Sequence, residues 1–171
     1  MFYCAIPSPL GPLTLASDGT ALIGLWLPGQ KYFAAGLEPD AKEQPDLPVF
    51  RQTKAWLAAY FAGDDLPPLP PLRPCGTAFR QAVWALLLDI PSGETVTYGE
   101  LSARLRKEGL SGSPRAVGGA VGHNPISILI PCHRVLGAGG RLTGYAGGLA
   151  AKEYLLTLEK TCRQRLSGNE R

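Results

Sequence analysis

Residues 124–135 read Asn-Pro-Ile-Ser-Ile-Leu-Ile-Pro-Cys-His-Arg-Val and place a cysteine beside a histidine after an apolar run. The run predicts a buried strand that ends at Ile130, because Pro131 fixes its own φ and holds the preceding residue extended. Neighbouring side chains of a regular strand point to opposite faces. Cys132 and His133 can therefore cooperate only if the backbone turns at Pro131, and such a turn predicts an activated thiolate at a fixed position.

A nucleophilic cysteine needs a base or a positive charge nearby, because a free thiol is only partly ionised at neutral pH. His133 is the candidate base, directly or through one water, and Arg134 adds positive charge. Glu153, at the start of an expected final helix, is the carboxylate best placed in the sequence to orient the imidazole. A buried cysteine beside a surface histidine gives the same pattern, so the pair alone leaves both interpretations open.

Length and composition indicate a globular protein of one large or two small domains, with 171 residues of which 45% are hydrophobic and 18% charged. No apolar run is long enough to span a bilayer, and residues 1–7 lack the basic end and apolar core of a signal peptide. We therefore expect a cytoplasmic protein, with no membrane partner. Its four cysteines are widely separated and it has only two histidines, so we expect neither disulfides nor a metal site, and no cofactor.

Charge divides the chain into an acidic and a basic part. Residues 1–72 hold four Lys/Arg against seven Asp/Glu, a net charge of −3, whereas residues 73–171 hold thirteen against seven, a net charge of +6. This asymmetry favours an anionic partner for the second part only. Many solvated surfaces are equally basic, so charge alone does not assign nucleic acid.

The first third of the chain predicts a small antiparallel sheet and a helix. Three apolar segments separated by turn residues predict strands at residues 2–6, 13–16 and 21–27. Helical spacing of apolar residues predicts a covering helix over 49–62. The following stretch, residues 64–74, contains five prolines, which neither a helix nor a central strand accommodates, and it predicts a linker. We therefore expect domains at 1–72, ending in the linker, and 73–171.

The second part is predicted to be mainly helical. Candidate caps and apolar spacing predict helices over 77–89, 98–106, 114–123 and 149–163. The second and third of these helices are separated by a Gly- and Ser-containing turn, which is typical of a helix-turn-helix. The expected fold class is therefore α+β, a small sheet-plus-helix domain joined to a mainly helical domain with a helix-turn-helix.

The third of these helices has an unusual composition. Gly118 and Gly119 lie in its interior, where each costs roughly 1 kcal/mol relative to alanine. Such residues are expected where another surface approaches the backbone closely, either a nucleic-acid groove or a neighbouring helix. Arg115 is the only charged side chain between Ser111 and Gly122, and it is a candidate for insertion into a base stack.

Several motifs together resemble the O6-alkylguanine-DNA alkyltransferases, over nearly all of residues 77–160. The matching segments are Phe79-Arg-Gln81, Val83-Trp84, Gly93-Glu-Thr-Val-Thr-Tyr98, Arg115-Ala-Val-Gly-Gly-Ala120, Asn124-Pro125, Ile128–Val135, Gly144-Tyr-Ala-Gly-Gly148 and Lys152-Glu153. The resemblance implies a ribonuclease H-like first domain and a monomeric protein that binds double-stranded DNA carrying alkylated guanine. It implies irreversible, single-turnover transfer of the alkyl group to Cys132, with O4-alkylthymine as a possible second substrate.

The resemblance also implies a role for each matching residue. Cys132 accepts the alkyl group, His133 is its base through a water, and Glu153 orients His133. Asn124 ties the turn to the helix-turn-helix, and Tyr98 helps extrude the nucleotide and protonates the guanine at N3. Arg115 fills the gap in the duplex, beside Ala116 and Gly118 of the DNA-binding helix. The base pocket is formed by Val135, Tyr145 and Ala146, and main-chain groups of Val135 and Cys132 read the guanine edge.

Three features depart from the family pattern. The chain lacks the Cys/His set with which some members bind zinc, and Ala146 stands where some relatives have serine, which leaves only its backbone N–H to contact the substrate oxygen. Residues 107–113 are extended relative to compact members. Two other classes stay open as alternatives: a non-enzymatic module that only binds alkylated DNA, and a Cys-His-Glu hydrolase that turns over many times.

Overall fold

A computed structural model describes residues 1–168, which form two compact units. The first unit comprises Met1–Cys75 together with Pro125–Leu129, and the second comprises Gly76–Asn124 and the chain from Ile130 onward. The change of unit at residue 75 lies close to the expected end of the linker. The assignment of Pro125–Leu129 to the first unit was not anticipated, since the sequence gives no sign that the chain returns there.

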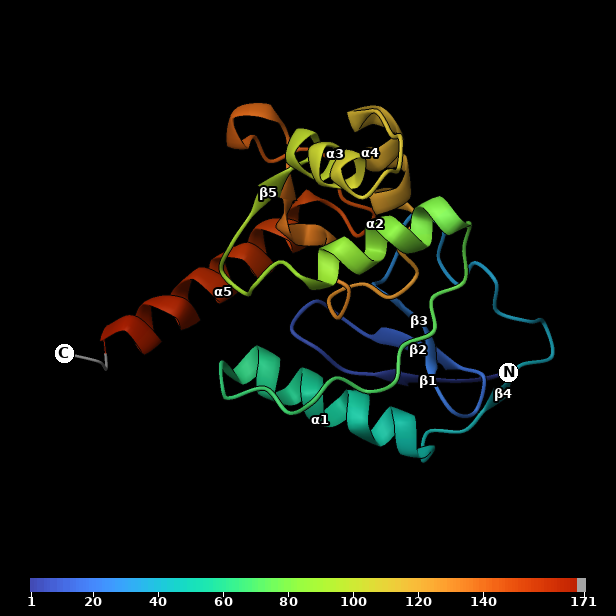
Figure 1. The fold of residues 1–171 in the computed structure, drawn as a ribbon. Coiled ribbons are helices and arrows are strands. Elements are labelled where there is room, and N and C mark those ends of the chain that lie inside the picture. The colour runs from blue at the N-terminus through green and yellow to red at the C-terminus, as the bar shows by residue number, and fades with distance from the viewer. Residues whose placement is uncertain (169–171) are drawn as a thin grey trace. The chain divides into compact units, whose positions relative to one another are not determined.

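The first unit is built on a four-stranded sheet with the order β3-β2-β1-β4 (Figure 1). Its strands are β1 (Phe2–Ile6), β2 (Leu13–Ser17), β3 (Leu22–Trp26) and β4 (Lys42–Glu43). The first three pair antiparallel, which confirms the predicted strands and hairpins. The short β4 was not predicted and pairs parallel to β1, so the sheet is mixed and not purely antiparallel.

Helix α1 (Pro48–Ala62) packs against this sheet, as its apolar spacing predicts. It begins with a proline in its first turn and ends at Gly63, whose φ of 73° is the left-handed cap conformation that glycine adopts without strain. Its buried face consists of Val49, Phe50, Thr53, Trp56, Leu57 and Tyr60.

The outer edge of β3 is covered by two separate segments of the chain. Leu22 pairs with Leu72 of the proline-rich stretch, and Leu25 pairs with Ile126 through the bonds Leu25 N to Pro125 O (2.9 Å) and Ser127 N to Leu25 O (3.0 Å). The buried Ser127 hydroxyl lies 3.0 Å from Oε1 of Gln30. These bonds satisfy an otherwise exposed strand edge, and they hold the linker against the sheet instead of leaving it as a free spacer.

The second unit contains a group of three helices, in which α4 packs against the other two (Figure 1). They are α2 (Ala78–Leu88), α3 (Tyr98–Lys107) and α4 (Pro114–Gly122). Thr77 and Thr97 cap the first two as predicted, and Ser113, which was not predicted as a cap, caps α4. α4 packs against both α2 and α3, and Trp84 Nε1 donates a 2.9 Å hydrogen bond to the Ala120 carbonyl. The segment 108–113 joins α3 to α4, which gives the expected helix-turn-helix arrangement.

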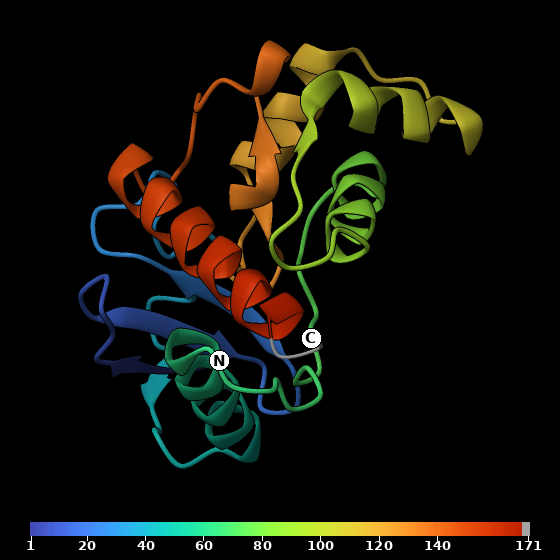
Figure 2. The ribbon, with the colours of Figure 1, turned by 90° about the vertical axis from the view of Figure 1, so that its left-hand side faces the viewer.

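A two-stranded parallel sheet and a long helix complete the second unit. Strand β5 (Val96–Thr97) pairs with β6 (Val135–Leu136), and neither strand was predicted. Helix α5 (Leu149–Gly168) extends beyond its expected end and is the long helix in Figure 2. None of the helices within residues 1–168 is long and apolar enough to cross a membrane.

Candidate active site

The backbone turns at Pro131, as the adjacent cysteine and histidine require. Cys132–Arg134 form a short 3-10 helix, η1, and Arg134 N donates a 3.0 Å hydrogen bond to the Pro131 carbonyl. The predicted strand before the turn is wrong: the segment forms only one bridge, at Ile126, and Ile128 has a φ of 71°. A positive φ is costly for a β-branched residue and breaks the strand geometry. The turn therefore follows an irregular segment pinned to the edge of β3.

Cys132 is buried, with 4% of its surface exposed. Asn124 Nδ2 donates to the Cys132 sulfur at 3.1 Å and to the Ile130 carbonyl at 2.8 Å. Burial raises the pKa of the Cys132 thiol, whereas the Asn124 hydrogen bond, the positive charge of Lys152 and the Tyr145 hydroxyl lower it. The resting group is therefore a protonated thiol with thiolate-stabilising groups already in place, and not the standing thiolate that the sequence suggested.

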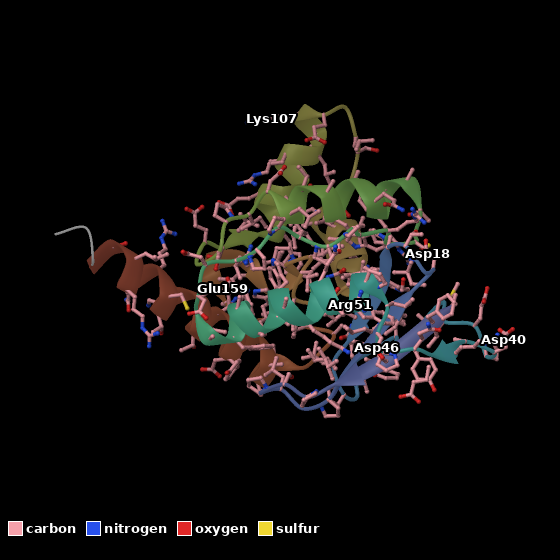
Figure 3. All side chains as sticks on the ribbon, turned by 90° about the horizontal axis from the view of Figure 1, so that it is seen from below. Asp18, Asp40, Asp46, Arg51, Lys107 and Glu159 are labelled. Atoms are coloured by element: carbon pink, nitrogen blue, oxygen red, sulfur yellow. The ribbon has the colours of Figure 1, made fainter. Side chains whose placement is uncertain are left out.

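His133 is fully buried and pairs with Glu159, not with Glu153. Its Nε2 lies 2.7 Å from Oε1 of Glu159, which is labelled in Figure 3. Burial lowers the pKa of His133, against the opposing influence of Glu159, so the imidazole is neutral. Because a carboxylate only accepts hydrogen bonds, Nε2 carries the ring proton, and Nδ1 is then the basic nitrogen.

The expectation for Glu153 is wrong because this residue does not lie on the buried face of α5. The buried residues of this helix are Lys152, Leu155 and Glu159, at helical spacing i, i+3, i+7, whereas Glu153 is exposed. The next residue, Tyr154, is 39% exposed. The apolar pattern of α5 misses this face, because a lysine and a glutamate occupy two of its three buried positions.

Arg134 was predicted only as a nearby positive charge, but it binds the same carboxylate as His133. Its Nε donates to Glu159 Oε2 at 2.9 Å and its Nη2 donates to Oε1 at 2.8 Å. Burial alone would raise the pKa of Glu159, but the hydrogen bonds and charges of His133 and Arg134 outweigh it and hold the pKa well below its usual range. Glu159 is therefore an anion at neutral pH.

Lys152 is a site residue that sequence reasoning noticed only as part of a motif. It is fully buried, and its Nζ donates to the carbonyls of Val135 (2.5 Å), Thr143 (2.9 Å) and Gly144 (3.0 Å). Burial lowers the pKa of Lys152 to about 8, partly opposed by Cys132. The lysine thus joins the start of β6 to the loop that precedes α5 and places a positive charge near the thiol.

Tyr98 begins α3, where the capping box of Thr97 and Glu100 fixes the start of the helix. Burial raises the pKa of its hydroxyl, and the nearby Cys132 raises it further. The ring lies 3.8 Å from the point that a β-carbon on Gly118 would occupy, and the hydroxyl lies 3.7 Å from the equivalent point on Gly144. Tyr98 therefore lies between α4 and the Gly144 loop, close to Cys132.

Of the residues assigned to DNA binding, Arg115 and Ala116 lie on the exposed side of α4, whereas Gly118 and Tyr98 are half-buried and lie close together. Arg115 and Ala116 are exposed in its first turn, where the Ser113 hydroxyl accepts a 3.1 Å hydrogen bond from Ala116 N. Gly119 is also exposed, and a β-carbon there would meet no atom within 4 Å. Internal packing therefore does not explain Gly119, although the sequence left that interpretation open.

The residues expected to form the base pocket lie in two different segments of the chain. Val135 is fully buried at the start of β6, while Tyr145 and Ala146 are half-buried in the loop before α5. Lys152 connects the two elements through its bonds to the Val135 and Gly144 carbonyls. In the described part of the chain no group of three or more His, Cys, Asp or Glu side chains could hold a metal ion.

These features define a helix-turn-helix protein with a buried Cys–His–Glu site. Comparison with known proteins makes the class specific. Residues 1–72 match the family model "6-O-methylguanine DNA methyltransferase, ribonuclease-like domain", and residues 78–161 match the model "6-O-methylguanine DNA methyltransferase, DNA binding domain". The chain belongs to the 6-O-methylguanine DNA methyltransferase family.

Individual relatives agree over almost the whole chain. A methylated-DNA–protein-cysteine methyltransferase of Haemophilus influenzae is 45% identical and matches over 94% of this chain and 87% of its own length. The protein of the same name from Mycobacterium bovis is 48% identical and matches over 93% of this chain and 92% of its own length. A crystal structure of Mycobacterium tuberculosis OGT in complex with DNA has a TM-score of 0.83 and 44% identity, covering 95% of this chain and 94% of that one.

Proposed function

We propose that this protein repairs DNA by moving an alkyl group from O6-alkylguanine to Cys132 in a single, irreversible event. The observation that carries the proposal is the buried Cys132 thiol, hydrogen-bonded by Asn124 and followed directly by the His133–Glu159 pair. A relative of similar fold has been crystallised with DNA, and the relatives most similar in sequence carry the name of a methylated-DNA–protein-cysteine methyltransferase.

The proposed reaction is a displacement at the alkyl carbon. His133 takes the proton of Cys132 through Nδ1, directly or through one water, while Glu159 stabilises the imidazolium that forms. The thiolate attacks the carbon, a new C–S bond forms, and the electron pair of the broken C–O bond remains on guanine O6. Tyr98 supplies a proton to the guanine ring at N3, so the base leaves as neutral guanine. The thioether is not hydrolysed, which ends the reaction after one event.

Extrusion of the damaged nucleotide is assigned to α4. Unstacking a base costs a few kcal/mol, and an inserted side chain with a close protein surface can offset this cost. Arg115 is exposed at the start of α4 and fills the gap in the duplex, while Ala116 and Gly118 permit a close approach. The flipped base is bounded by Val135, Tyr145 and the Ala146 backbone, and main-chain groups of Val135 and Cys132 read its edge. O4-alkylthymine fits the same chemistry as a second substrate.

The assignment of parts follows from this chemistry. We place DNA binding and alkyl transfer in residues 73–171, and we assign residues 1–72 a supporting role. The protein acts as a monomer on double-stranded DNA in the cytoplasm, a reducing compartment that suits its free Cys132 and three further free cysteines.

The number of turnovers tests the proposal against both alternatives. An excess of duplex oligonucleotide containing O6-methylguanine is incubated with a known amount of protein, and the repaired base is quantified over time. Single-event transfer predicts a plateau at no more than one repaired base per protein molecule. Continued turnover beyond that plateau would indicate a hydrolase, and binding with no repair would indicate a recognition module; either result contradicts the proposal.

Arg115→Ala is expected to weaken repair of duplex DNA roughly tenfold, and repair of the same lesion in single-stranded DNA much less. The lost side chain no longer fills the gap in a duplex, whereas a single strand has no gap to fill. Single-turnover rates on the two substrates measure the effect. Arg51→Ala is the matched control, because Arg51 is an exposed arginine of α1 (Figure 3). Equal losses on both substrates would contradict the role in base extrusion.

Gly119→Ala is expected to change stability and repair in opposite directions. Alanine in an exposed helix interior stabilises the fold by about 1 kcal/mol relative to glycine, and the added methyl group meets no atom of the protein. If DNA lies against this face, the same methyl group weakens duplex binding severalfold. Chemical denaturation measures the first effect, and affinity for an unmodified duplex measures the second. A stabilised variant with unchanged affinity for the duplex would show that DNA does not lie against this face of α4.

A further inference from the structure

We propose that Arg134 is a positioning residue for the alkyl transfer: it balances the charge of Glu159 and so leaves His133 neutral and able to accept the thiol proton. The inference rests on the proposed function, in which His133 is the base. It adds a requirement that the Cys–His–Glu arrangement alone does not contain.

The geometry of Arg134 is that of a fixed counterion. The residue is 7% exposed, and its guanidinium donates hydrogen bonds to both oxygens of Glu159, through Nε and Nη2. Its Nη1 donates to the Ile90 carbonyl in the turn after α2, and Gly93 N of the same turn donates to Glu159 Oε2 at 3.2 Å. Two oxygens therefore accept from His133, Arg134 and a main-chain amide, and neither partner of the ion pair can turn away without losing several hydrogen bonds.

The charge of a buried carboxylate must be balanced locally, because an uncompensated buried charge is costly. Two groups that can carry a positive charge bond Glu159, the His133 imidazole and the Arg134 guanidinium. Arginine stays protonated at every relevant pH. While Arg134 is present it balances Glu159, and His133 need not be protonated. Without Arg134 the same carboxylate would be balanced by a proton on His133, which then could not take one from Cys132.

The groups that face His133 determine in which direction its pKa moves when Arg134 is removed. They are Cys132 and Arg134 from η1, and Lys152 and Glu159 from α5. Burial lowers the pKa of His133, the positive charges of Arg134 and Lys152 lower it further, and Glu159 raises it. Removal of the Arg134 charge therefore raises the pKa of His133. Since transfer needs the neutral imidazole, the acid limb of the pH–rate profile must move to higher pH.

The test compares Arg134→Gln with Arg134→Lys by NMR titration of the histidine rings. The chain has only His123 and His133, so His123→Gln in each background assigns both signals. We expect Arg134→Gln to raise the midpoint of His133, to move the acid limb of the single-turnover rate in the same direction, and to slow transfer at pH 7 roughly tenfold. Arg134→Lys, which keeps the charge but not the two-pronged contact, should leave the midpoint near that of the wild type.

A folded Arg134→Gln with an unchanged His133 midpoint would overturn the inference, as would an Arg134→Lys whose midpoint rises although the charge is kept. If Arg134→Gln does not fold, the lysine variant alone decides between these outcomes. The titration does not depend on alkyl transfer. A wild type that transfers no methyl group would therefore refute the proposed function, whereas normal transfer with an unshifted titration in the glutamine variant would refute only the role of Arg134.

Discussion

Replacing Cys132 by serine is expected to reduce alkyl transfer to the rate seen without protein, while binding of the alkylated duplex stays unchanged. A serine hydroxyl is far less acidic than a thiol, and a neutral base such as His133 does not make it a nucleophile strong enough to displace guanine. The substitution is nearly isosteric, so the Asn124 amide retains an acceptor at this position. Transfer is measured with radiolabelled methyl groups, and binding is measured by fluorescence anisotropy.

Cys162→Ser provides the control for this experiment, because Cys162 is a half-buried free thiol of α5 outside the site. It should transfer as the wild type does. Retained transfer in Cys132→Ser, or its loss in Cys162→Ser, would mean that another residue accepts the alkyl group. Loss of DNA binding in Cys132→Ser would instead indicate that the serine variant is misfolded, which circular dichroism would reveal.

Replacing Glu159 by glutamine is expected to slow transfer on the order of 100-fold, because the imidazolium formed at His133 loses its carboxylate partner. The same change should lower the free energy of unfolding by about 3 kcal/mol, since it leaves Arg134 as a buried charge without a counterion. Single-turnover kinetics and urea denaturation measure the two effects. Both follow from the finding that Glu159, and not Glu153, bonds His133.

Glu153→Gln is the matched control, six residues earlier on the same helix and exposed. It should leave the transfer rate and the unfolding free energy unchanged. A loss of transfer in Glu153→Gln comparable to that in Glu159→Gln would restore the original assignment from sequence. If Glu159→Gln is too unstable to assay, Glu159→Asp keeps the charge with a shorter side chain and should fold, with a smaller loss of rate.

Sequence reasoning works best in this protein where a local signal has one physical meaning. Thr77 and Thr97 predict the starts of α2 and α3 because each can cap a helix, and Pro114 predicts the start of α4 because proline suits the first helical position. Pro131 predicts the turn at Cys132 because its ring restricts both its own backbone and that of the residue before it. In such cases the decisive interaction lies within three or four residues of the signal.

The remaining features depend on contacts between distant parts of the chain. The apolar run at 126–130 matches a strand, but hydrogen bonds from Leu25 fix only one bridge and leave Ile128 in a left-handed conformation. Lys152 and Glu159 are charged, so a search for apolar spacing assigns them to the surface. They are buried because the carbonyls around Lys152 and the hydrogen-bond donors around Glu159, among them the Arg134 guanidinium, compensate their charges. These partners are distant in the sequence, so no local pattern predicts them.

The most direct test of the central claim is the mass of the protein after exposure to an oligonucleotide that contains O6-methylguanine. If Cys132 accepts the methyl group, the intact protein gains the mass of one CH₂ group, in at most one-to-one yield, and peptide mapping places the methyl group on the peptide containing Cys132. An unchanged mass in wild-type protein that still binds the oligonucleotide, or a methyl group on any other residue, would contradict that claim.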